Sequence, residues 1–94
     1  MPTTTKPKVF QLGRVCATHK AHDSIQPACL RNAIDRHAHC DWGDVTDNDR
    51  AANNHAVSHG LRILSQYTSQ DGDDFWIITE ADRSSTMILF PNEY

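Results

Sequence analysis

The sequence predicts an α+β domain in two layers, with two helices packed on an antiparallel sheet and the element order β-α-α-β-β-β. Three observations lead to this fold class. The last third of the chain alternates apolar and polar residues between turn signals, the middle holds two segments with helix-capping residues, and 94 residues suffice for one modest core. We therefore expect one domain that ends in a three-stranded meander.

The N-terminal segment differs in composition from the rest of the chain. Residues 1–7 are mainly threonine, lysine and proline, and we expect them to form a flexible basic arm before a single domain at residues 8–94. The segment VFQL alternates in polarity and predicts a first strand from Lys8 to about Thr18. Gly13 marks a weak point or bulge within that strand.

Two helices are expected in the middle of the chain. Asp23 or Ser24 can cap the first helix, Pro27 suits its early turn, and it should end near His39. One face of this helix carries Leu30, Ala33, Ile34 and His37.

The second helix has clear signals at both ends. Thr46 is expected as its N-cap, and Asp47 and Asp49 in the first turn complement the positive end of the helix dipole. Gly60 is expected as a left-handed C-cap. The helix from Asp47 to His59 has a thin apolar stripe, formed by Ala52, Ala56 and Val57.

The last third predicts two successive hairpins. The expected strands are Leu61–Thr68, Asp74–Ala81 and Thr86–Phe90, joined by turns at Ser69–Asp73 and Asp82–Ser85. One face would carry Ile63, Ser65, Tyr67, Phe75, Ile77 and Thr79, and the other Arg62, Leu64, Trp76, Ile78 and Glu80. Because both faces are partly apolar, we expect the helices on one side and partial cover by the arm, a loop or another subunit on the other.

Charge and cysteine content narrow the possible settings. Residues 1–20 carry four basic residues and no acid, whereas the rest of the chain holds twelve acids against five arginines, a balance of −7. Such a body is either an ordinary solubilising surface or an acidic face that meets a basic, nucleic-acid-binding partner, and it would repel nucleic acid itself. Mimicry of DNA by the acids of residues 41–49 and 71–74 is physically possible. No apolar run is long enough to span a membrane. The three cysteines lack CxxC spacing and no signal peptide precedes them, so we expect a cytoplasmic protein.

Histidines suggest one possible metal site. His55 and His59 are spaced i, i+4 on the second expected helix, which places both imidazoles on one face. His37 and Cys40, at the end of the first helix, could complete a four-coordinate zinc site. The alternative is that these histidines are scattered surface groups.

Polar residues at the ends of the meander strands form another candidate site. Arg62 and Glu80 could form an ion pair on one face, and Asp82 and Arg83 could organise the second turn. A salt-bridged hairpin and a binding epitope are both compatible with this pattern. The four glycines are widely spaced and predict no phosphate-binding loop, and no motif marks a catalytic nucleophile.

Four segments carry a family resemblance: RHAHCDWGD (36–44), GLRILSQY (60–67), FWIITEADRSST (75–86) and ILFPNEY (88–94). Together they resemble a family of small plasmid-related proteins of bacteria, found on plasmids and other mobile genetic elements, over roughly residues 9–94. Cys40 stands where the family pattern has glycine, and THKA at residues 18–21 stands where the family has Thr-Pro-Gly-Ala. His39, His55 and His59 are not part of that pattern.

The resemblance implies a mobile-element setting, in which small proteins often counter host defences by binding. We therefore expect a non-enzymatic accessory protein that binds a host defence protein or ribonucleoprotein, as an anti-CRISPR or anti-restriction inhibitor. The expected contact residues are Asp41, Trp42, Asp44, Arg62, Asp71, Asp73, Glu80, Asp82 and Arg83, with Trp42 as the anchor. The alternatives are a zinc-binding protein, which could be a hydrolase, and a small DNA-binding regulator that uses the arm. The sheet face with Trp76 and Ile78 makes a homodimer reasonable.

Overall fold

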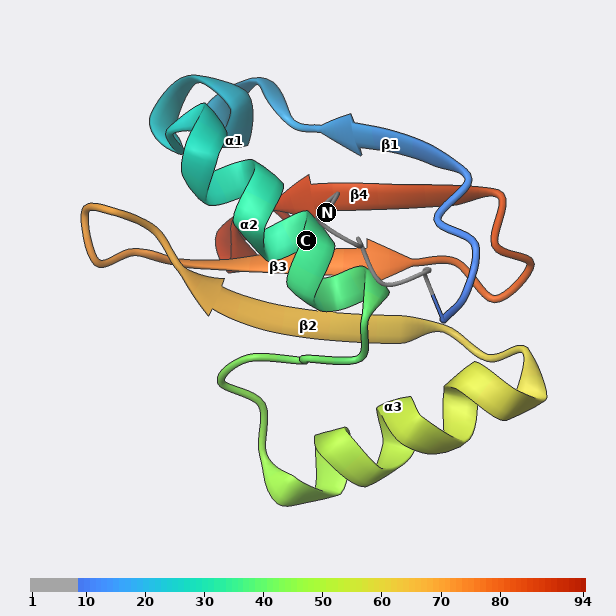
Figure 1. Ribbon diagram of the computed structural model, residues 1–94. Coiled ribbons are helices and arrows are strands. Elements are labelled where there is room, and N and C mark those ends of the chain that lie inside the picture. The colour runs from blue at the N-terminus through green and yellow to red at the C-terminus, as the bar shows by residue number, and fades with distance from the viewer. Residues whose placement is uncertain (1–8) are drawn as a thin grey trace, which may run out of the picture.

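Four strands form one mixed sheet in the computed structural model, which describes residues 9–94 (Figure 1). The strands are β1 (Arg14–Ala17), β2 (Ile63–Thr68), β3 (Asp74–Thr79) and β4 (Ser85–Leu89), in the spatial order β1-β4-β3-β2. The pairs β2·β3 and β3·β4 are antiparallel and form the predicted C-terminal meander. The predicted α+β class is therefore confirmed. The predicted arm at residues 1–7 lies outside the described residues.

The first strand differs from its prediction in length and in direction. β1 covers only Arg14–Ala17 and runs parallel to β4, so the sheet is mixed and not wholly antiparallel. Gly13 has a φ of 64°, which ends the extended backbone before Arg14. The residues before Gly13 run instead toward α2 (Pro27–Ala38), where the Val9 amide donates to the Ala38 carbonyl. The alternating segment VFQL that predicted the strand therefore lies outside β1, and its Phe10 and Leu12 are buried in the core instead.

Three helices are present where two were predicted. The additional helix, α1 (His19–Ser24), begins at Thr18, whose hydroxyl accepts a hydrogen bond from the Ala21 amide. Asp23 and Ser24 therefore lie inside α1 and do not cap the next helix. That helix, α2, has Pro27 in its first turn and His39 as its C-cap, as predicted.

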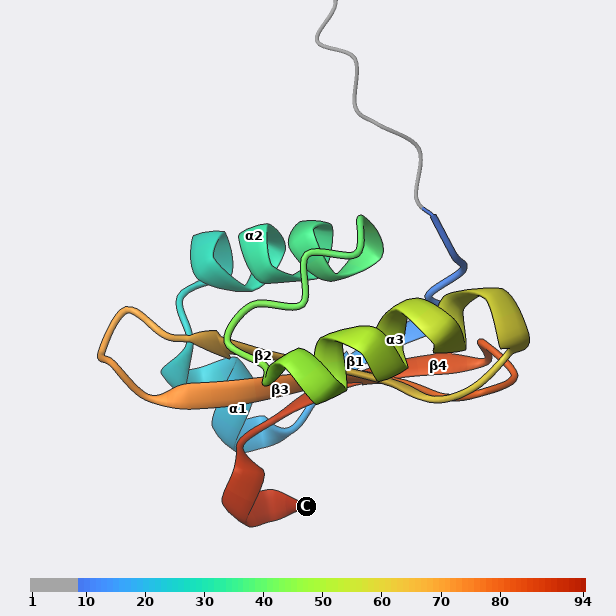
Figure 2. The same cartoon turned by 90° about the horizontal axis from the view of Figure 1, so that it is seen from below.

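The third helix, α3 (Asp47–His59), has the predicted ends. The Thr46 hydroxyl accepts a hydrogen bond from the Asp49 amide, and Gly60 closes the helix with a φ of 63°. Its predicted apolar stripe is only partly correct, because Ala56 is buried whereas Ala52 is exposed and Asn53 is buried in its place. α3 lies along β2 at the margin of the sheet (Figures 1 and 2).

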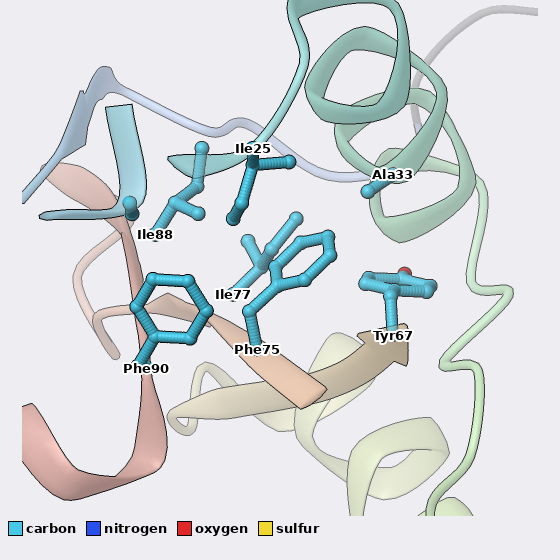
Figure 3. Close-up of a cluster of buried hydrophobic side chains, with 8 residues drawn as sticks. Ile25, Ala33, Tyr67, Phe75, Ile77, Ile88 and Phe90 are labelled. Carbon is cyan, nitrogen blue, oxygen red and sulfur yellow. The ribbon is translucent and has the colours of Figure 1, made fainter. Parts of the chain in front are cut away.

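The helices α1 and α2 contribute to a core on the predicted apolar face of the meander. Figure 3 shows Tyr67, Phe75 and Ile77 of the sheet beneath Ile25 and Ala33. All six residues predicted for this face are buried. A second cluster joins the segment before β1 to α2, α3 and β2, and its buried members are Phe10, Leu12, Ala38, Trp42, Ala56 and Ile63.

The opposite face of the sheet is covered by less of the chain. The 3-10 helix η1 (Pro91–Glu93) lies on the other side of the sheet from α2 (Figure 2). The Tyr94 and Trp76 rings pack in a T-shaped arrangement with 5.7 Å between their centres, and the Tyr94 hydroxyl accepts a hydrogen bond from Arg62. The C-terminal segment thus covers part of this face, which the prediction had assigned to the arm, a loop or another subunit. None of the helices within residues 9–94 combines the length and apolarity that crossing a membrane requires.

Candidate functional site

Two segments far apart in the sequence meet at one end of the sheet. The Thr68 hydroxyl lies 3.3 Å from Asp44 Oδ2 and 3.4 Å from Asp74 Oδ1. It thereby links the loop after α2 to the turn between β2 and β3. We call the exposed carboxylates of these two segments the acidic end, which consists of Asp44, Asp71, Asp73 and Asp74.

The loop that carries Asp44 is fixed against the outer edge of β2. Gln66 accepts a hydrogen bond from the Asp44 amide and donates one to the Trp42 carbonyl, at 2.8 and 3.0 Å. Gly43 lies between them with a φ of 74°, and a Cβ atom there would stand 2.0 Å from the Gln66 carbonyl oxygen. This position therefore requires glycine. The backbone from Trp42 to Asp44 pairs with Gln66 of β2 in the manner of a short additional strand.

The turn that carries Asp71 and Asp73 is also fixed. The Ser69 hydroxyl accepts hydrogen bonds from the amides of both aspartates. The Gln70 side chain donates to the Ser24 carbonyl and accepts from the Gln26 amide, at 2.7 and 3.1 Å, which attaches the turn to the region between α1 and α2. The carboxylates of Asp71 and Asp73 are thus exposed to solvent on a turn whose backbone is fixed by hydrogen bonds.

A cleft of about 360 Å³ adjoins this turn. Asp73 and Asp74 stand on its wall together with Lys20, whose Nζ lies 5.3 Å from the centre of the Phe90 ring. The cleft thus has acidic groups and one cation beside an aromatic ring. No hydrogen bond or ion pair joins the Asp73 carboxylate to another side chain among residues 9–94.

The second predicted turn lies at the opposite end of the sheet (Figure 1). Arg62 Nε lies 3.7 Å from Glu80 Oε2, which confirms the expected ion pair. The Asp82 carboxylate accepts a hydrogen bond from the Ser84 amide, and bonds to Ser84 lower the pKa of Asp82. These residues are therefore separated from the acidic end by the length of the sheet.

Arg83 is a structural residue of that turn. Its backbone has a φ of 61°, and its guanidinium donates to the carbonyls of Leu61 and Ala56 at 2.7 and 2.9 Å. It also donates to the carbonyls of Glu80 and Ala81. Arg83 thus ties the turn to the end of α3, as its predicted role in organising the turn requires.

Asp41 and Trp42, which were also predicted as contact residues, make contacts that stabilise the fold. The Arg36 guanidinium binds both oxygens of Asp41, at 2.8 and 3.2 Å, and this hydrogen bonding lowers the pKa of Asp41. Trp42 is 1% exposed, and its Nε1 donates to the Asn54 side chain. The expectation that Trp42 anchors a partner is therefore wrong, because its indole fills the second core cluster.

The four predicted metal ligands are not assembled. The His55 and His59 rings stack at 3.8 Å on α3, as their spacing predicted. His37 is fully buried, however, and both of its ring nitrogens have hydroxyl partners. Within residues 9–94 no three side chains of histidine, cysteine, aspartate or glutamate form a group that could hold a metal ion.

A buried polar network crosses the core, and its partners could not be predicted from the sequence. His37 lies between Ser65, at 2.5 Å from Nδ1, and Thr79, at 2.8 Å from Nε2. Thr79 continues to Thr86, whose hydroxyl donates to the Leu12 carbonyl. Burial lowers the pKa of His37 to about 4. Although Ser65 and His37 are paired as in a nucleophilic enzyme, neither is exposed, so a substrate cannot reach them.

Sequence reasoning missed Thr68 and Gln70, whose side chains help to position the acidic end. The string DGDD at residues 71–74 marks the acidic turn in the sequence itself. Comparisons with protein-family models, curated proteins and solved structures gave no match to this chain, so functional inference rests on the contacts described above and on the sequence.

Proposed function

We propose that this protein is a non-enzymatic binding protein whose acidic end receives a basic macromolecule. The observation that carries this proposal is the position of the Thr68 hydroxyl between Asp44 and Asp74, which brings two acidic segments into one surface. The partner class follows from charge: a surface of carboxylates attracts proteins that bind nucleic acid through basic residues.

The fixed backbone of the acidic end supports binding. Ser69 and Gln70 hold the turn, and Gly43 holds the loop against β2. A surface that is already ordered loses little conformational entropy on association, which favours affinity. A catalytic function has less support. The Ser65–His37 pair is buried and closed to substrates, and the Arg83 guanidinium already donates its hydrogen bonds to backbone carbonyls.

The biological setting of the proposal comes from the sequence resemblance. We propose a cytoplasmic inhibitor carried by a mobile element, which binds a host defence protein or ribonucleoprotein of the CRISPR or restriction type. Nucleic-acid-binding channels of such targets are basic, and the acidic end would compete with the phosphate backbone for them.

A pair of charge-matched variants tests this function. Asp71→Asn with Asp73→Asn removes two charges from the acidic end, and Asp23→Asn with Asp35→Asn removes two exposed charges on α1 and α2. Each immobilised protein is exposed to the heparin-retained fraction of a bacterial extract, and captured proteins are identified by mass spectrometry. We expect the wild type and the control pair to capture the same nucleic-acid-binding protein, with added duplex DNA or salt releasing it, and the acidic-end pair to lose it. Equal capture by both pairs would rule out the acidic end as the contact surface.

A further inference from the structure

Other parts of the chain cover the β2 edge of the sheet but leave the β1 edge open within residues 9–94. At the β2 edge, the Asn53 side chain donates to the Leu64 carbonyl at 2.7 Å and accepts from the Leu64 amide at 3.2 Å. The next outward-facing residue, Gln66, is bonded on both sides by the loop around Gly43. The backbone groups of this edge are thus satisfied, which prevents another strand from adding there.

The β1 edge has no such cover. The amides of Arg14 and Thr18 donate to the Ser84 and Ile88 carbonyls of the β4 segment, both at 3.0 Å. Because backbone groups alternate along a strand, Arg14 and Cys16 face β4, whereas the N–H and C=O groups of Val15 face away from the sheet. No segment within residues 9–94 lies beside β1 on that side (Figure 1), and the Val15 side chain is 42% exposed.

We propose that the β1 edges of two copies of this chain pair antiparallel about Val15 and form one continuous eight-stranded sheet. In this register the two Val15 residues form a hydrogen-bonded pair and exchange both of their outward N–H···O=C bonds. The arrangement is isologous, because the same strand is used by both copies, and it closes at two copies.

In this register each Arg14 lies opposite Cys16 of the other copy. The two Arg14 residues are diagonal neighbours, and both of their side chains are exposed to solvent. The exposed Val15 side chains become neighbours and lose contact with water. This proposal does not depend on the acidic end, which lies on other strands and turns.

A proline substitution at the edge tests the pairing. Val15→Pro removes the outward N–H but none of the bonds that β1 makes with β4, so the monomer should fold as before. We expect sedimentation equilibrium to show the wild type passing from monomer to dimer between low micromolar and millimolar concentration, and Val15→Pro to stay monomeric with an unchanged melting temperature. As a control, Met87→Ser alters the exposed part of the sheet face and should dimerise like the wild type. A wild type that stays monomeric, or a Val15→Pro variant that dimerises equally, would overturn the proposal; a monomeric wild type would leave the edge to a different protein.

A cross-linking measurement covers the case in which Val15→Pro fails to fold. In the proposed register the two Cys16 residues are diagonal neighbours, about 7 to 8 Å apart. With Cys29→Ala and Cys40→Gly in the background, a short bis-maleimide should link two copies through Cys16, and Cys16→Ser should abolish the linked species. Absence of the linked species at millimolar protein would contradict the pairing.

Discussion

His37 donates a hydrogen bond through Nε2 to the Thr79 hydroxyl, 2.8 Å away, and the network around this pair fixes the protonation of the ring. The Thr86 hydroxyl donates to the Leu12 carbonyl, so it must accept from Thr79. Thr79 then has no proton left to give to His37, and Nε2 must carry one. Burial lowers the pKa of His37 to about 4, so above that pH the ring is neutral. With its one proton on Nε2, the neutral ring accepts a hydrogen bond from Ser65 at Nδ1.

This network predicts a specific dependence of stability on pH. The pKa of His37 is about 4 in the folded protein and 6.5 in an ordinary setting, so the unfolded chain binds more protons between these values. Stability should therefore rise with pH from about 4 to 6.5, by up to about 3 kcal/mol, and then level off. Urea unfolding measured across this range should show the slope for the wild type, and His37→Gln should largely lose it. The same slope in both proteins would show that other groups cause it.

Trp42 is expected to contribute to the stability of the fold. Replacing it with alanine should cost about 3 to 5 kcal/mol, because the fully buried indole leaves a cavity between Phe10 and His37. Trp42→Phe keeps most of the packing but loses the hydrogen bond to Asn54, so it should cost less. Denaturant midpoints of both variants give the measurement. A Trp42→Ala protein as stable as the wild type would contradict the placement of this side chain in the core.

Two glycines with similar backbone angles should respond differently to alanine. Gly43 and Gly60 have φ values of 74° and 63°, but a Cβ atom on Gly60 meets nothing within 4 Å. Gly60→Ala should therefore cost only the left-handed strain, about 1 kcal/mol. Gly43→Ala adds a collision with the Gln66 carbonyl and should cost at least about 3 kcal/mol. Hydrogen exchange at the Gln66 amide should also accelerate in Gly43→Ala but not in Gly60→Ala. Equal losses of stability in the two variants would show that the loop around Gly43 can shift without strain.

Cys40 occupies a backbone conformation that suits glycine. Its φ is 66°, and it follows the C-cap of α2, where a left-handed residue is usually glycine. Cys40→Gly removes the strain of a side chain in this conformation, whereas Cys40→Ala keeps the strain and loses the sulfur. We expect the glycine variant to be more stable than the alanine variant by about 1 kcal/mol in thermal or urea unfolding. If the alanine variant is the more stable one, packing of the side chain outweighs the strain.

Local patterns predicted the parts of the fold that local rules determine. Period-two alternation predicted both faces of the meander, and the residue types of Thr46 and Gly60 were enough to locate the ends of α3. The Arg62–Glu80 pair followed from the hairpin register. In contrast, α1 has only six residues and buries only Ala21 and no larger side chain, so it has no periodic signal.

The candidate site depended more on long-range contacts, and sequence reasoning was less successful there. The apolar stripe of α2 placed His37 on a buried face, but its partners Ser65 and Thr79 come from other elements and could not be identified. A tryptophan in a polar loop fits either a core or an interface, and only the packing of Phe10 and His37 around Trp42 distinguishes them. The proximity of Asp44 and Asp74, which share the Thr68 hydroxyl, likewise could not be predicted without knowledge of the fold.

The pairing of β1 with β4 also constrains when the protein can fold during synthesis. The hydrogen bond from Thr86 to the Leu12 carbonyl spans 74 positions, and β1 has no other strand beside it among residues 9–94. A nascent chain therefore cannot place β1 in the sheet until β4 has emerged from the ribosome exit tunnel, even though β1 is made first. Until then the β1 segment has to stay unpaired, and ribosomes stalled before Ser85 should carry a chain in which this segment remains sensitive to proteases.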